Sequence, residues 1–286
     1  MKRGWAALAA LSLAGGALWY GLHRPEPVRP ALWQVEGPGG QKGWLLGTIH
    51  ALPRAAAWRE GPVAKAWDGA DTVIVEIAAL NDDAATARAF QALAHTPGLP
   101  PLDARVSPQN RAALARALAA AHAKPGDFAD TESWAAALML AHEAATGNPA
   151  NGIDRAVLAE AGTKRVVELE GAGAQLAIFD RLPESAQRRL LDEAVSDAKP
   201  TADLATAWKK GDVATLSQET NRGILADPVL REALYAGRNR AWSAKIAQSL
   251  ASGAHPFVAV GAAHMAGPDA LPAMLAAQGY RVTRVQ

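Results

Sequence analysis

Two copies of one short pattern, an apolar run that leads into Gly-x-x-His, constrain this chain more than any other feature. The first is Gly43 to Leu52 (GWLLGTIHAL), which contains His50, and the second is Phe257 to Pro268 (FVAVGAAHMAGP), which contains His264. Short apolar runs are typical of strands buried in a sheet, and glycine lets the chain turn sharply where it leaves the sheet. We therefore expect both histidines to follow the ends of buried strands.

In α/β folds, ligands bind in the crevice outside the carboxyl ends of the strands. His50 and His264 are 214 positions apart in the chain, yet two such strands can bring their side chains together over one edge of a sheet. A purely structural interpretation stays open. In that case the histidines only hydrogen-bond at strand ends, and they lie on opposite sides of the sheet.

The segment from Asp71 to Ala78 (DTVIVEIA) is the clearest predicted strand, and Glu76 interrupts its apolar run. A carboxylate buried alone is costly, so Glu76 needs a cation, hydrogen bonds or a metal ion as its partner. We also expect a third buried strand from Lys164 to Glu170 (KRVVELE). In that strand Glu168 and Glu170 share one face, and Glu170 reaches the site only if all three strands end at the same edge.

The remaining patterns predict an α/β fold with a central mixed sheet flanked by helices. Ala31 to Val35 and Gly43 to Ile49 flank a glycine-rich turn and predict a hairpin, while Tyr280 to Val285 alternates like an edge strand. Helical periodicity dominates residues 82 to 160, which predicts a helical middle segment. No second linker divides residues 31–286, so we expect a single domain.

The N-terminus has the features of an export segment. Residues 1–22 (Met1 to Leu22) begin with two basic residues and continue as an uncharged apolar run, which predicts a cleaved signal peptide or a membrane anchor. Residues 23–30 contain three prolines and are expected to form a stiff linker. Both versions place the body of the protein outside the cytoplasm, in the periplasm or anchored to the inner membrane and facing the periplasm.

Composition narrows the classes of function. Apolar residues make up 50% of the chain and charged residues 20%, which suits a packed core, and the net charge of +1 argues against a nucleic-acid groove. Cysteine is absent, so the chain has neither a disulfide nor a thiol nucleophile. The only expected membrane contact is the N-terminal segment, and the oligomeric state stays open.

Arg238 and Asn239 stand on a predicted helix, Leu234 to Ser249, directly before the second histidine strand. An arginine at this place can hold Glu76, bind a substrate carboxylate through its planar fork, or stabilise an oxyanion. Asn239 can orient any of these groups. A solvated helix face is the alternative, because neighbouring positions are also basic.

Several motifs together resemble the TraB/GumN family, which is related to the Tiki metalloproteases. The resemblance is carried by the two Gly-x-x-His turns, VIVE, GID followed by KRVVELEG, RNRAW, and the terminal VGAAHMAGPDALPAMLAAQGYRVTRV, in an order that runs from Leu32 to Val285. It implies an α/β fold with an internally duplicated core. For the Tiki relatives it implies metalloprotease activity that uses divalent manganese or cobalt.

The resemblance also implies roles for individual residues. His50 and His264 match the paired motif histidines, Glu76 matches the acid on the strand after the first, and Arg238 with Asn239 matches an Arg-Asn pair. Two neutral imidazoles and one carboxylate suffice to hold a divalent ion, zinc included, with one position left for water.

The first hypothesis is a metal-dependent hydrolase, a peptidase. His50, Glu76 and His264 hold the metal, Arg238 and Asn239 hold the substrate or an oxyanion, and Glu170 serves as the base. The second hypothesis is a non-catalytic protein that binds a peptide or another small ligand at the membrane surface, using a groove between the helices.

Overall fold

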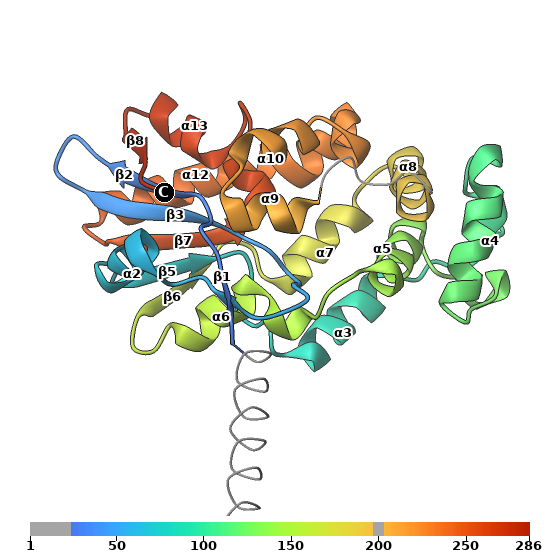
Figure 1. Ribbon diagram of the computed structural model, residues 1–286. Coiled ribbons are helices and arrows are strands. Elements are labelled where there is room, and N and C mark those ends of the chain that lie inside the picture. Colours follow the sequence, from blue (N-terminus) through green and yellow to red (C-terminus); the bar gives the residue numbers. More distant parts are fainter. Residues whose placement is uncertain (1–23, 197–202) are drawn as a thin grey trace, which may run out of the picture.

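The computed structural model describes residues 24–196 and 203–286, and its centre is a six-stranded mixed sheet (Figure 1). The strand order is β6-β5-β7-β3-β2-β8. The bounds are β2 (Leu32–Glu36), β3 (Lys42–Thr48), β5 (Thr72–Val75), β6 (Arg165–Glu168), β7 (Pro256–Gly261) and β8 (Arg281–Arg284). Neighbours from β6 to β3 are parallel, whereas β2 is antiparallel to both β3 and β8. The predicted α/β class with a mixed central sheet is confirmed.

The hairpin of β2 and β3 and the edge strand β8 lie where the alternation of the sequence predicted them. The prediction of a third buried strand was wrong in one respect. β6 forms the other edge of the sheet and three of its four residues are exposed. An edge strand has a neighbour on one side only, so its apolar residues are less covered than those of β5, which is buried throughout.

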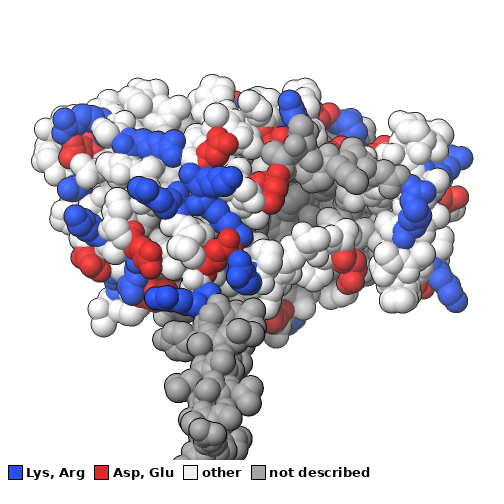
Figure 2. Space-filling view, in the orientation of Figure 1, with Lys and Arg blue, Asp and Glu red and all other residues white. Residues whose placement is uncertain are grey.

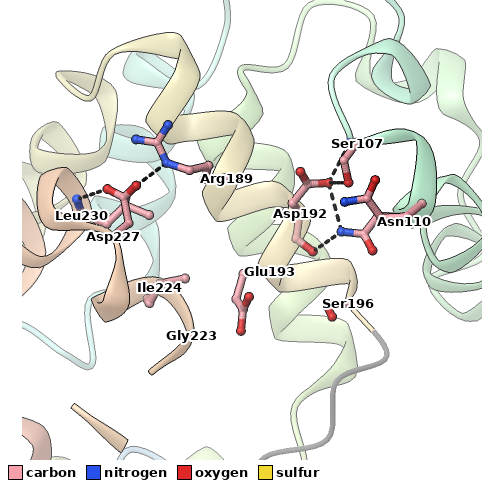
Figure 3. Close-up of a pocket in the computed structure, with 11 residues that line it drawn as sticks. Ser107, Asn110, Arg189, Asp192, Glu193, Ser196, Gly223, Ile224, Asp227 and Leu230 are labelled. Carbon is pink, nitrogen blue, oxygen red and sulfur yellow. Dashed lines mark hydrogen bonds and ion pairs between the residues drawn. The ribbon is translucent and has the colours of Figure 1, made fainter. Parts of the chain in front are cut away.

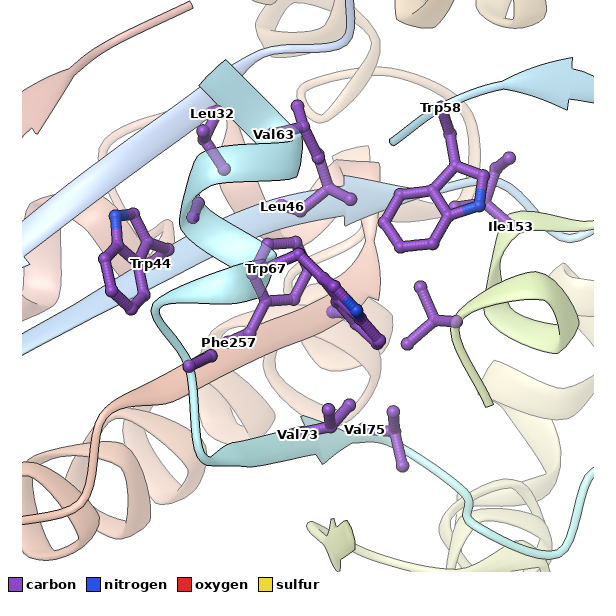
Figure 4. Close-up of a cluster of buried hydrophobic side chains, with 14 of the residues drawn as sticks. Leu32, Trp44, Leu46, Trp58, Val63, Trp67, Val73, Val75, Ile153 and Phe257 are labelled. Carbon is purple, nitrogen blue, oxygen red and sulfur yellow. The ribbon is translucent and has the colours of Figure 1, made fainter. Parts of the chain in front are cut away.

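Alternating side chains give the sheet two apolar faces. On one face, Trp44 and Phe257 pack with Trp67 and other side chains of α2 (Gly61–Asp68) and with side chains of α6 (Ile153–Glu160) (Figure 4). On the other face, Leu45 and Val258 pack against α12 (Gly237–Ala251) and α13 (Leu271–Ala277). The period of two along each strand thus decides which strand side chains point to which face.

A second core lies beside the sheet, to the right in Figure 1, and is formed by helices of the predicted middle segment together with two helices from residues 172–195. Its helices are α3 (Asp83–Leu93), α4 (Arg111–Ala120), α5 (Ser133–Ala144), α7 (Ala172–Asp180) and α8 (Glu184–Val195). Asp82 caps α3, because its side chain accepts a hydrogen bond from the Ala85 N–H. Trp134 lies fully buried at the centre of this core.

Shorter helices complete the chain around the sheet. They are α9 (Leu204–Lys210), α10 (Val213–Glu219) and α11 (Pro228–Arg231), and a π-helical turn, Glu232–Ala236, leads from α11 into α12. Among the described residues there are 3-10 turns at Leu102–Ala104, Pro108–Asn110, Pro125–Phe128, Pro149–Asn151, Gly223–Ala226 and Ala262–Met265.

The described part of the expected linker, 24–30, packs on the domain instead of standing apart from it. β1 (Glu26–Pro27) pairs with β4 (Ala56–Ala57), and Val28 and Pro30 are buried. The predicted export segment, 1–22, lies outside the described residues. Within 24–196 and 203–286, no helix has the length and hydropathy needed to cross a membrane.

Acidic and basic side chains are interspersed on the face shown in Figure 2, over both the sheet and the helical part. This mixing accords with a net charge of +1, and it gives this face no large patch of a single sign. The prediction that the chain has no nucleic-acid partner stays a prediction.

Candidate functional site

The carboxyl ends of β3, β5 and β7 meet at one edge of the sheet, because these strands run parallel with Thr48 beside Gly261 and Val75 beside Ala259. The predicted site residues follow those ends. His50 comes two residues after β3, Glu76 directly after β5, and His264 in the turn after β7. His50 and Glu76 interact electrostatically, because the positive charge of His50 contributes to lowering the pKa of Glu76.

Gly47 has a different role from the predicted one, which was to let the chain turn where it leaves the sheet. Gly47 lies inside β3 and its φ is not positive. A side chain there would approach the Ala262 backbone to 2.9 Å, so glycine permits close contact between β3 and the turn that carries His264.

His50 is held from one side by Asp154, which lies in the first turn of α6. The His50 Nδ1 is 2.8 Å from Asp154 Oδ2, and Thr48 Oγ1 donates to Asp154 Oδ1 at 2.5 Å. This hydrogen bond and the negative charge of Asp154 raise the pKa of His50 to about 9. The ring is 77% exposed, and its Nε2 has no hydrogen bond to any residue in the described ranges.

Asp154 was not among the predicted site residues, although it belongs to the GID motif that carried part of the resemblance. Ile153 N–H donates to the Ile49 carbonyl at 2.9 Å, which docks the start of α6 against the exit of β3. Gly152 makes this approach possible, because a Cβ at that position would lie 2.3 Å from the His50 carbonyl oxygen.

His264 is buried, with 6% of its surface exposed, and its Nδ1 is 2.6 Å from Asn239 Oδ1. Asn239 Nδ2 donates to the Asp269 carbonyl at 2.7 Å, so the amide oxygen must face the histidine. The His264 Nδ1 therefore carries the proton and its Nε2 carries the lone pair. Burial lowers the pKa of His264 to about 3, which keeps the ring neutral.

The lowered pKa of His264 predicts that the fold begins to lose stability at a pH well above the range in which ordinary carboxylates take up protons. The neutral ring is favoured in the folded state, so its contribution is complete above the unfolded pKa of 6.5 and is lost as the pH falls toward 3. Between pH 6.5 and 4.5 the free energy of unfolding should fall by about 2 kcal/mol.

Urea denaturation of the wild type and of His264→Gln across that pH range measures the effect. In His264→Gln the free energy of unfolding should no longer fall between pH 6.5 and 4.5. His142→Gln, which alters an exposed histidine on α5, should show the same fall as the wild type. Equal slopes in all three proteins would contradict the assignment of the neutral ring.

The Glu76 side chain is only 11% exposed, and both of its carboxylate oxygens have partners. Oε1 accepts the Gly261 N–H at 2.8 Å, while Oε2 accepts Arg238 Nη2 at 2.7 Å and Gln175 Nε2 at 3.0 Å. Burial opposes the charged form, but nearby positive groups, Arg238 among them, and the Gly261 N–H lower the pKa of Glu76 below its usual value.

Arg238 joins the acids from two strand ends. Its Nε and Nη2 donate to Glu170 at 2.9 and 2.8 Å, and its Nη1 lies 3.4 Å from the His264 Nε2. The guanidinium carbon lies 4.5 Å from the centre of the Trp242 ring, and Trp242 Nε1 donates to Glu170 Oε1 at 3.0 Å. Of the open alternatives for Arg238, the structure shows the ion pair with Glu76.

Comparison with known proteins agrees with the motifs that join at this edge. A model of the TraB/PrgY/gumN family matches residues 31–284. The chain belongs to the TraB/PrgY/GumN family. Proteins named "Uncharacterized protein YbaP" from Shigella flexneri and from Escherichia coli (strain K12) are each 28% identical over 271 residues, which cover 90% of this chain and 96% of each relative. No solved structure matches the chain significantly.

Two of the predicted metal ligands, Glu76 and His264, have other partners in the structure. Glu76 is engaged by Arg238 and Gln175, and the His264 Nε2 faces the Arg238 guanidinium. Among residues 24–196 and 203–286, no three His, Cys, Asp or Glu side chains form a group that could hold a metal ion. The predicted set of His50, Glu76 and His264 does not fit a metal ion in this arrangement, and its ligand role stays a prediction.

The roles predicted for Asn239 and Glu170 also stay predictions, but their surroundings are now defined. Asn239 is fully buried and both ends of its amide are used, so in this arrangement it orients His264. Glu170 receives Arg238 and Trp242. Gln175 was not predicted, since a lone glutamine on an apolar helix carries no recognisable signal.

A polar pocket in the helical part lies apart from these residues (Figure 3). It has a cavity volume of about 250 Å³ between α8, Pro108–Asn110 and α11, and it contains none of the predicted site residues. Its charged groups are largely paired. Asp192 accepts hydrogen bonds from Ser107 and Asn110, and Arg189 pairs with Asp227.

Proposed function

We propose that this TraB/PrgY/GumN chain is a hydrolase, with peptides or related amides as its class of substrate, and that His50 is its catalytic base. The observation that carries the proposal is the His50 and Asp154 pair, which stands at the carboxyl edge of the sheet with Nε2 exposed. A carboxylate on Nδ1 fixes the tautomer and the orientation of the ring, and leaves Nε2 free for proton transfer.

His50 would accept a proton from an attacking water at Nε2 and return it to the leaving amine. Asp154 stabilises the imidazolium that forms between these two steps. The buried network of Glu76, Arg238 and Glu170 lies at the same edge and holds the ends of β5 and β6 in place around the reacting groups.

The resemblance implies a divalent metal, whether manganese, cobalt or zinc, and the dependence of activity on each metal is to be measured. Export of the protein also stays a proposal, because the segment expected to direct it lies outside the described residues. Peptide as the substrate comes from the Tiki resemblance and not from the geometry of the site.

A fluorogenic peptide library tests the proposal with the full-length protein, after EDTA treatment and again with added manganese, cobalt or zinc. We expect His50→Gln to reduce kcat by roughly 100-fold to 10,000-fold, the usual contribution of a general base. His142→Gln is the matched control and should keep wild-type turnover. A wild type that cleaves no peptide or ester under any of these conditions would refute the proposal.

A second candidate, a binding protein without catalysis, is favoured by one observation. Glu76, Glu170 and Arg238 satisfy one another, so the buried part of the site is complete without a reactant. Tight peptide binding without turnover, and unchanged in His264→Ala, would support this candidate. Turnover that disappears in the same variant would count against it.

A further inference from the structure

Arg238 lies where three groups suited to a cation converge. Its guanidinium contacts Glu76 Oε2 at 2.7 Å and Glu170 Oε2 at 2.8 Å, and its Nη1 is 3.4 Å from the His264 Nε2. Only 11 to 13% of the Arg238, Glu76 and Glu170 side chains is exposed. The guanidinium therefore lies between the two carboxylates and this nitrogen.

The His264 Nε2 is an independent indication that this place suits a cation. The orientation of the Asn239 amide puts the proton on Nδ1, so Nε2 presents a buried lone pair toward Arg238. One imidazole nitrogen and two carboxylates are a common ligand set for divalent metals. A divalent ion placed there would displace Arg238 from its partners and leave a positive guanidinium buried close to it.

We propose that Arg238 is the resident cation of this site, and that its charge prevents a divalent metal from binding between His264, Glu76 and Glu170. The site of the proposed hydrolase then works without a metal at this position. The inference concerns the same site as the proposed function. Metal binding is measured without turnover, so the exclusion of a metal and the hydrolase function can each be refuted without the other.

Calorimetric titration of the full-length protein with manganese, cobalt and zinc tests the inference. The wild type and Arg238→Lys, which keeps the positive charge, should show no binding that saturates at one ion per chain. Arg238→Gln removes the charge and keeps a polar side chain, so it should bind manganese at least roughly 100-fold more tightly than the wild type. Arg240→Gln, an exposed neighbour on α12, is the matched control and should behave as the wild type.

Arg238→Gln leaves two carboxylates without their cation, so its folding needs a separate measurement. Thermal unfolding with EDTA and with manganese should show a higher Tm with manganese for this variant alone, because a ligand that binds only the folded state stabilises it. One divalent ion per wild-type chain, lost in His264→Gln, would overturn the inference. A folded Arg238→Gln that binds no metal would also overturn it.

Discussion

Replacing Arg238 by Met is expected to lower the free energy of unfolding by about 3 to 5 kcal/mol at neutral pH. The guanidinium holds Glu76 and Glu170, and all three side chains are almost completely buried. Methionine restores much of the volume but leaves two buried carboxylates without a cation, and this is costlier than losing a pair exposed to water. Urea denaturation monitored by tryptophan fluorescence measures the difference.

The pH dependence of this loss of stability separates the effect of the missing charge from the effect of altered packing. At low pH the unpaired Glu76 carboxylate can take up a proton, so the deficit of Arg238→Met should shrink as the pH falls. A deficit caused by packing alone would stay constant. Arg240→Met is the control, because the Arg240 side chain is 56% exposed, and a surface substitution should change stability by less than about 0.5 kcal/mol.

Replacing Asp154 by Asn is the second substitution with a large expected effect, and it acts on the proposed reaction. In the wild type, a base with a pKa of about 9 predicts that kcat/KM rises with pH and levels off above about pH 9. Asparagine removes the charge and permits the wrong tautomer of His50. The midpoint should therefore move down toward the ordinary value of 6.5, and the plateau should fall by roughly 100-fold to 10,000-fold.

A purely structural role for Asp154 makes a different prediction. It would lower the amount of folded protein without moving the midpoint of the pH profile. Asp68→Asn, which alters an exposed acid at the end of α2, is the control and should leave both the midpoint and the plateau unchanged. An Asp154→Asn variant with the wild-type midpoint would contradict the assignment of Asp154 as the residue that positions His50.

The charge network explains why one prediction from the sequence had to stay open. Glu76 in an apolar strand required a partner, and the pattern allowed a metal, hydrogen bonds or a basic side chain. The structure supplies Arg238, which is 162 positions away, and the backbone N–H of Gly261. The choice depends on how the start of α12 is placed over the strand ends, and no local pattern encodes that placement.

The contact between Asp154 and His50 is a second one that no local sequence pattern encodes. The sequence predicts helix across residues 82 to 160, and within that range α6 begins at Ile153. Nothing in the spacing shows that this helix docks on the exit of β3, 104 positions earlier, where Asp154 meets His50. The raised pKa of His50 is therefore a consequence of tertiary contact alone.

The sequence by itself determined the β2–β3 hairpin, the buried strands β3, β5 and β7, and the position of His50, Glu76 and His264 just after strand ends. These features follow from hydrophobic period and turn chemistry, which act over a few residues. Only the tertiary structure decided which groups these three side chains contact, because each contact joins elements that are far apart in the chain. It thereby also decided that the cation beside Glu76 is a guanidinium.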